Sequence, residues 1–499
     1  FSSRRRHTRY PLVTGVQTCA LPILTHSPPA MSSRVASGFA VLAPLGRALE
    51  ATPLPPLPGL GRNASVLAYA WFLWGLGAGL WAYTWPVYLA SLGADSVQVG
   101  SVIGVGSLIA TLVYLPGGFV AQLGNHKWQM VALHGLHTLA TGSFALAGEW
   151  WHVVPGVLLQ NFVALLAPAV NGYLTRVADE ERVGVARLYS VIGSAQFIAM
   201  TVSPPAGGWV SREFGDHAVF PLALLGCGLS VLAMAMCRSF ALPPRVGAEP
   251  ASSPVRTSRR GGALGAGWAS YRDLLSSGPV RLLLITSLAV NVAIHVAIQF
   301  SAIYLRDHFA YDTAGIGWTG AAASAGAATI VLVIERLRRK WGLRLAMVAA
   351  CALTGVHFLA TLASPALWVQ ALGYFCRGGI PAIGTLVTVA LTDRSDRANV
   401  ASGVALLATT GGIAAIVMPP LGGWMYASIP AAPFIAGAAA LALAQGLVWI
   451  TFRPLPRREP VAPGRGAPQL GVIGYAARPS ARGSYSPEYD ETPLSPEGD

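Results

Sequence analysis

One apolar stretch, residues 367–391, carries polar residues at the spacing of a single helix face. The intervals are four, three, four, four and three, and the residues are Gln370, Tyr374, Arg377, Pro381, Thr385 and Thr388. Arg377 lies near the middle, where an arginine in a membrane helix costs ~2.5–3.5 kcal/mol on insertion scales. Because a guanidinium matches a carboxylate or phosphate with two parallel hydrogen bonds, Arg377 could anchor an anionic group. The alternative is a structural arginine that binds helix-end carbonyls or polar side chains.

The sequence offers Arg377 no acidic partner at the same depth. Every Asp and Glu falls in a predicted loop, a tail or a helix end, as Glu149, Asp307 and Glu335 do. This pattern favours a counter-charge supplied by a bound solute. It disfavours proton coupling through a buried carboxylate.

Two further stretches carry polar residues that we predict to bind substrate. Asn291, His295 and Gln299 recur every four residues in the stretch 282–305. His295 could titrate near neutral pH and serve as a proton-coupling residue, or it could form a hydrogen-bonded cavity wall. The stretch 153–175 contributes Gln160, Asn161 and Asn171, of which the first and last share a helix face.

Aromatic residues crowd the stretch 66–89. Trp74 and Trp81 lie at a depth where they could form a wall that stacks on rings or sugar faces. They could equally face lipid.

These candidates must be positioned by membrane helices. Hydrophobic residues make up 53% of the 499 residues and charged residues only 11%, whereas soluble domains carry about 25% charged residues. A helix needs ~20 apolar residues to cross ~30 Å of hydrocarbon, and backbone hydrogen bonding in lipid excludes other open structures. Twelve stretches qualify: 66–89, 99–123, 129–147, 153–175, 188–210, 219–237, 282–305, 316–334, 343–362, 367–391, 400–425 and 432–452. The predicted fold class is therefore all-α, integral to the membrane, with about twelve transmembrane helices.

Basic residues set the predicted orientation. Two of them, Arg212 and Arg306, fall in one set of alternate loops, and the other set holds about twenty. The positive-inside rule then places both termini in the cytoplasm of a bacterial inner membrane. The net charge of +13 is explained by this topology, so we expect no nucleic-acid partner.

The second half of the sequence repeats features of the first. Residues 203–209 read SPPAGGW and residues 418–424 read MPPLGGW, each at the end of the fifth span of its half. A Lys-Trp pair recurs at Lys127 and Lys340. Matching features in the same orientation predict two pseudo-symmetric bundles of six helices.

The remaining segments give the predicted domain boundaries. We expect a non-native leader at 1–24, which resembles a translated sequencing adapter, with Met31 as the start and a signal peptide as the alternative. A disordered cytoplasmic segment follows at 25–64, then bundles at 65–239 and 282–452. A connector at 240–281 joins them, and a disordered cytoplasmic tail covers 453–499.

Together these features resemble the major facilitator superfamily. The family's loop signature is matched at Gly117, Gly124 and Lys127, although Ala121 stands where the family has an acidic residue. The resemblance implies two bundles that rock about a central cavity lined by 66–89, 153–175, 282–305 and 367–391. It also implies gating roles for this signature and for the repeated motif, at Gly117, Gly124, Lys127, Pro204, Gly207, Gly208, Pro419, Gly422 and Gly423.

The function expected from this sequence is secondary active transport of a small solute, with an organic anion as the leading substrate class. Export of neutral sugars or amphipathic drugs is the alternative, as is a non-transporting sensor that signals through the tail. We expect no enzymatic activity, no cofactor and no metal, because hydrolase, P-loop and metal-ligand motifs are missing from the sequence. The coupling ion is open, a proton being one candidate.

Overall fold

The computed structural model describes residues 50, 52, 54–120, 125–240, 271–395 and 400–453, and the regular elements in these ranges are helices. The N-terminal half contains α3 (Arg62–Ala82), α4 (Trp85–Ser91), α5 (Ser96–Val120), α6 (His126–Ala145), η1 (Trp150–Val153), α7 (Val154–Phe162), η2 (Val163–Leu166), α8 (Ala167–Glu180), α9 (Val185–Phe214), η3 (Asp216–Ala218) and α10 (Val219–Ala235). The C-terminal half contains α12 (Gly278–His295), η4 (Ile298–Phe300), α13 (Ser301–Phe309), α14 (Thr313–Trp341), α15 (Leu343–Ala363), α16 (Leu367–Cys376), α17 (Gly379–Arg394), α18 (Val400–Ser428) and α19 (Ala432–Thr451).

Each of the twelve predicted spans corresponds to a helix or to consecutive helices. Within the described ranges, ten helices are long and apolar enough to cross a membrane, or eleven if α7 and α8 are counted as one span with a 44° bend. The remaining predicted span is α6, which has the length of a span but a more polar sequence. Its polar residues, among them Lys127, His134 and His137, are buried against neighbouring helices rather than exposed.

The described helices can be set beside the predicted bundle bounds of 65–239 and 282–452. Helix α3 begins at Arg62 and α12 at Gly278, slightly before the predicted starts at 65 and 282. Residues 54–61, predicted as disordered, lead into α3, and the Leu57 amide donates to Ser65 Oγ at 2.8 Å. The predicted leader 1–24, most of the connector and most of the tail lie outside the described residues, as does Gly124.

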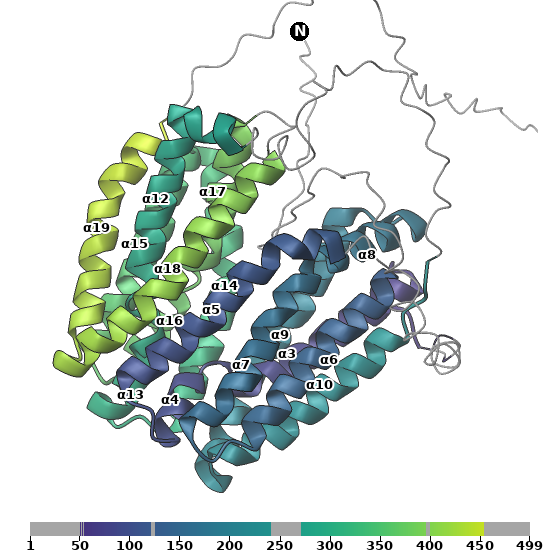
Figure 1. Ribbon diagram of the computed structural model, residues 1–499, viewed down its shortest axis with the longest axis horizontal. Helices are drawn as coiled ribbons and strands as arrows, with labels where there is room; N and C mark the ends of the chain where they lie inside the picture. Colours follow the sequence, from purple (N-terminus) through teal and green to yellow (C-terminus); the bar gives the residue numbers. More distant parts are fainter. Residues whose placement is uncertain are drawn as a thin grey trace, which may run out of the picture. The chain divides into compact units, whose positions relative to one another are not determined.

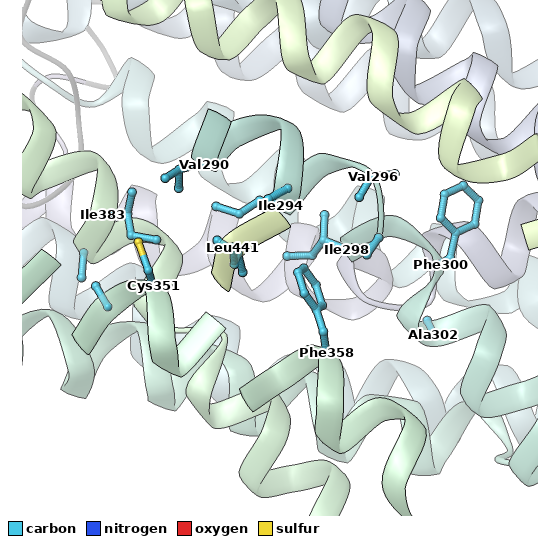
Figure 2. Packing of buried hydrophobic residues seen from close by; sticks show 14 of the residues in the cluster. Val290, Ile294, Val296, Ile298, Phe300, Ala302, Cys351, Phe358, Ile383 and Leu441 are labelled. Atoms are coloured by element: carbon cyan, nitrogen blue, oxygen red, sulfur yellow. The ribbon is translucent and has the colours of Figure 1, made fainter. Parts of the chain in front are cut away.

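Side chains from several spans meet in the core of the C-terminal half. Figure 2 shows Val290 and Ile294 of α12 beside Cys351 and Phe358 of α15, with Leu441 of α19 among them. These residues are less than a tenth exposed. The cluster packs α12 against α19 and joins both helices to α15.

Two pairs of long helices form most of the contact between the halves, and the short helices α4 and α13 also meet. Helix α5 runs along α18, and α9 runs along α14 (Figure 1). We call the α9–α14 contact the first seam and the α5–α18 contact the second seam. The seam end is the end of the molecule at which α5 and α14 begin and α9 and α18 end.

Candidate functional site

The four spans expected to line a cavity are all interrupted. The first breaks between α3 and α4, the fourth at η2, the seventh around η4 and the tenth between α16 and α17. A mid-membrane break leaves backbone groups without intrahelical partners, which is tolerated where they are buried in protein or line a cavity. The interruptions thus set these spans apart as candidates for a solute site.

Arg377 lies at one of these breaks. It forms the C-cap of α16, and α17 begins two residues later at Gly379. Its guanidinium carbon lies 5.5 Å from the ring centroid of Tyr83, which belongs to the opposite half of the molecule. The break is held against α14 because Gly378 packs directly on the backbone of Gly326.

Tyr83 ties Arg377 to the first seam. The Tyr83 hydroxyl and Ser324 Oγ of α14 form a hydrogen bond of 3.0 Å, and the Tyr83 ring packs against Gly320 one turn away. Tyr83 itself stands at the break between α3 and α4. One aromatic side chain therefore contacts the arginine, α14 and the helix break at once.

The charge of Arg377 is not matched by a carboxylate in the described part of the chain. The side chain is partly buried, with Tyr374 and His357 close to it. Its guanidinium lies over the uncharged Tyr83 ring, so with respect to the described residues an anion could approach it without displacing an ion pair.

Gln370 and Tyr374 do not join Arg377 in an open polar face. Gln370 is fully buried, and its side-chain amide donates to the carbonyls of Ala360 (2.8 Å) and Ser364 (2.7 Å) at the end of α15. Tyr374 is also buried, and its ring centroid lies 4.9 Å from that of His357. These contacts hold α16 against α15. For Gln370 and Tyr374 they indicate a structural role in helix packing.

The polar residues of the seventh span lie near the second seam. Asn291 donates to the Ser287 carbonyl at 2.8 Å, and its side chain adjoins Gly411 of α18. His295 closes α12, and its Nδ1 is buried without a hydrogen-bond partner among the described residues. Gln299 follows in η4 and is partly buried.

The fourth span places its polar residues within the N-terminal half. Asn161 donates to the Val157 carbonyl at 2.9 Å and lies against Gly106 of α5. Asn171 accepts a hydrogen bond of 2.9 Å from the Tyr189 hydroxyl of α9. Gln160 is partly buried.

The predicted aromatic wall turns toward α6. The Trp74 and Trp81 rings lie 5.3 Å and 6.4 Å from the ring of His137, between centroids. Trp81 is buried, and it also contacts Phe144 and Phe220 within the N-terminal half. This packing gives no support to a role in stacking on sugars or amphipathic drugs.

The repeated motif closes both seams in the same way. Thr313 Oγ1 donates to the Gly208 carbonyl at 2.9 Å, and Ser96 Oγ donates to the Gly423 carbonyl at 2.9 Å. A Cβ atom on Gly208 would collide with the Thr313 carbonyl, and one on Gly423 with the Ser96 carbonyl. The second glycine of each motif is thus the point where the two halves touch through their backbones.

The prolines of the motif continue each seam by one turn. Pro204 presents its carbonyl oxygen to Gly317 of α14, and Pro419 presents its own to Gly100 of α5. Glycine at the receiving position allows the two backbones to meet.

The first glycine of each motif faces inward instead. Gly207 packs on the Leu80 carbonyl of α3, and Gly422 packs on the Val296 carbonyl after α12. Each first glycine thus contacts a helix of its own half, and each second glycine contacts the other half. The repeated sequence therefore produces a repeated structure.

The loop signature behaves differently from the motif. Lys127 is fully buried and bonded to Glu50 Oε1 at 2.7 Å. Gly117 packs against the Leu165 carbonyl of η2, inside its own half. Neither residue contacts the C-terminal half in these interactions, so their predicted gating roles gain no support here.

Sequence reasoning missed Tyr83 and Ser324. Tyr83 stands among more conspicuous tryptophans, and only Pro86 nearby signals the helix break beside it. Ser324 sits in a run of Gly and Ala, a composition that favours close helix approach. Their pairing across the two halves has no signal in the helical periodicity.

A family model described as Major Facilitator Superfamily matches residues 67–314 and 291–485. An uncharacterized MFS-type transporter of Methanocaldococcus jannaschii is 24% identical over 166 residues, which are 32% of this chain and 42% of that relative. The chain thus matches less than half the length of this curated relative.

Solved structures share the fold at low sequence identity. A variant of the nucleoside transporter NupG has a TM-score of 0.65 at 14% identity, covering 79% of this chain and 100% of its own. The human organic anion transporter MFSD10 has a TM-score of 0.54 at 18% identity, covering 79% and 100%. A bacterial homologue of the iron transporter ferroportin, in an inward-facing state, has a TM-score of 0.60 at 13% identity. The match covers 79% of this chain and 99% of that chain.

Proposed function

The chain belongs to the major facilitator superfamily, and on that premise we propose that it moves a small organic anion across the membrane by alternating access. The carboxylate or phosphate group of the solute binds Arg377. The two halves rock about this point, so that the solute is exposed to one side of the membrane at a time.

The observation that carries this proposal is that no described carboxylate pairs with Arg377. Its guanidinium carbon instead lies 5.5 Å from the centroid of the Tyr83 ring. A cation–π contact is worth only about 0.5–2 kcal/mol and leaves the positive charge in place. An anionic solute would supply both the missing charge and two parallel hydrogen bonds.

The helix break adds to this attraction. Helix α17 begins at Gly379, directly beyond Arg377, and its N-terminus carries a partial positive charge. Broken membrane helices in other transporters direct such N-termini at anionic groups. The Arg377 guanidinium and the N-terminus of α17 would therefore both favour a negatively charged ligand.

The distribution of basic residues among the loops indicates which side of the membrane the closed seams face. If the positive-inside rule holds, the seam end faces outward and both termini lie in the cytoplasm of a bacterial inner membrane. The seams then close the outer entrance, and the solute reaches Arg377 from the cytoplasm. His295 is the proposed site for a coupling proton because its Nδ1 is buried without a hydrogen-bond partner in the described part of the chain.

Thermal unfolding of the purified protein in detergent tests the proposal. Organic carboxylates, phosphorylated solutes, neutral sugars and hydrophobic cations are added separately to wild type, Arg377→Gln and Arg281→Gln. Arg281 is exposed near the start of α12, so its variant removes the same charge away from the site. A ligand at 100 times its Kd stabilises the folded state by about 2.7 kcal/mol.

We expect an anion to raise the Tm of wild type and Arg281→Gln but not of Arg377→Gln. Arg377→Lys should respond weakly, because an ammonium keeps the charge but loses the bidentate geometry. Equal stabilisation of all four proteins by neutral or cationic ligands would show that Arg377 has a structural role.

A further inference from the structure

The C-terminal half carries a group of basic and tryptophan residues at the end opposite the seams. Helix α14 ends there at Trp341, and Gly342, with φ +92°, turns the chain directly into α15. We call this group the basic corner, consisting of Arg336, Lys340, Trp341, Arg344 and Trp449. It shares no residue with the proposed solute site.

Glu335, the only carboxylate of helix α14, is already engaged. Glu335 binds Arg338 at 2.7 Å and Arg339 at 3.3 Å. Arg336, Lys340 and Arg344 have no ion pair among the described residues. The basic corner therefore keeps three positive charges that the described protein does not neutralise.

Two of these cations lie over exposed indole rings. Lys340 Nζ is 5.4 Å from the Trp341 centroid, and the Arg344 guanidinium carbon is 4.6 Å from the Trp449 centroid. Trp341 is 59% exposed and Trp449 49% exposed. Tryptophan favours the headgroup level of a membrane, so the rings would hold these charges at the depth of lipid phosphates.

The equivalent position in the N-terminal half shows the contrast. The Lys-Trp pair there has its lysine, Lys127, fully buried and bonded to Glu50 at 2.7 Å. In the C-terminal half, Lys340 is exposed and has no carboxylate partner among the described residues. The same dipeptide is thus neutralised internally in one half, and in the other it is left for an external anion.

We propose that the basic corner binds the headgroup of one anionic phospholipid. Its phosphate contacts Lys340 and Arg344, and its acyl chains lie on exposed apolar side chains beside them, Leu345 (41% exposed) and Ile450 (49% exposed). Basic pockets between membrane helices are suited to anionic headgroups by charge and depth. Apolar surface next to the cations favours a lipid over a free phosphate ion.

Native mass spectrometry of the purified full-length protein tests this site. The protein is titrated with phosphatidylglycerol or with phosphatidylcholine, and retained lipids are counted. The variant Arg336→Gln/Lys340→Gln removes two exposed charges and leaves the Arg344–Trp449 contact intact. Arg272→Gln/Arg281→Gln removes two exposed charges outside the basic corner and serves as the matched control.

Wild type should retain one phosphatidylglycerol more tightly than any phosphatidylcholine. Each basic residue near a lipid headgroup contributes about fivefold in affinity, so the double variant should bind this lipid about 25-fold more weakly. The control should bind it as wild type does. Unchanged Tm of the double variant without added lipid would exclude misfolding as the cause.

Three results would overturn the proposal. The first is equal retention of both lipids by wild type. The second is equal loss of phosphatidylglycerol from the variant and the control. The third is competition by millimolar glycerol phosphate, which would identify a site for free anions rather than for lipid.

Discussion

Alanine at Gly208 or Gly423 should shift the protein away from the state with closed seams. An added methyl group would overlap the carbonyl oxygen of Thr313 or of Ser96, both in the opposite half. Because the obstacle is backbone, it cannot move aside as the end of a flexible side chain can. The strain is relieved when the halves separate, so it acts on the closed state alone.

The size of the shift follows from the cost of overpacking. Inserting a methyl group into a tight contact costs about 1–3 kcal/mol. A cost of this size in one of two states changes their population ratio by roughly 5–150-fold. The double variant Gly208→Ala/Gly423→Ala strains both seams and should shift the ratio further.

The neighbouring glycines provide a matched control. Alanine at Gly207 or Gly422 would meet the carbonyl of Leu80 or Val296, which belong to the same half as the glycine. If each half moves as a unit, this strain is present in both states. These variants should lower the Tm while leaving the population ratio unchanged.

Electron–electron double resonance measures the distance between two spin labels and can report the opening of the seams. Spin labels at Ser91→Cys and Ser428→Cys, both exposed near the seam end, lie on opposite halves. We expect a longer distance component in Gly208→Ala and Gly423→Ala that is weak in wild type and in Gly207→Ala. The reasoning would be refuted by identical distance distributions in all variants, or by the same new component in the Gly207→Ala control.

Three other predictions concern single side chains. Burial pushes the pKa of Glu50 upward, but the hydrogen bond and charge of Lys127, together with hydrogen bonds from Ser239, outweigh it and hold that pKa below its usual value. The resulting stability should be present above the ordinary carboxyl pKa, fall as pH drops through the lowered value, and lose this dependence in Glu50→Gln, as Tm measured against pH would show. Tyr83→Phe keeps a ring beside Arg377 and should change anion affinity less than about threefold in a thermal titration, whereas Tyr83→Ala removes a contact of about 0.5–2 kcal/mol and should alter affinity by more. Gln370→Leu removes two partly buried hydrogen bonds to the carbonyls of Ala360 and Ser364 and should destabilise the protein by about 1–3 kcal/mol in chemical unfolding, without changing its anion selectivity.

The sequence predicts the spans well because backbone groups in the bilayer must be hydrogen-bonded within the protein, which favours helices. Long apolar runs must become helices in lipid, and their ends are marked by charge and by Gly and Pro. The span 129–147 shows the limit of this signal. Its helix, α6, is buried by its neighbours and can carry Lys127, His134 and His137 at the cost of apolar character.

The candidate site could be predicted only in part. The sequence singles out Arg377 because a cation in an apolar run is costly wherever it lies, and its role as a binding residue stays a prediction. The polar face drawn on a regular helix also included Gln370, but α16 ends at Cys376, and Gln370 turns to the carbonyls of α15. The contact between Arg377 and Tyr83 depends on how the α3–α4 break packs against the α16–α17 break. Residue spacing along one helix carries no information about such packing.

Uptake of a radiolabelled anion into proteoliposomes tests the central claim most directly. The anion is the one that stabilises wild type in detergent, and wild type, Arg377→Gln and Arg281→Gln are compared at equal reconstitution. The account predicts saturable uptake by wild type and Arg281→Gln and none above background by Arg377→Gln. Uptake by Arg377→Gln at the wild-type rate and affinity would contradict it.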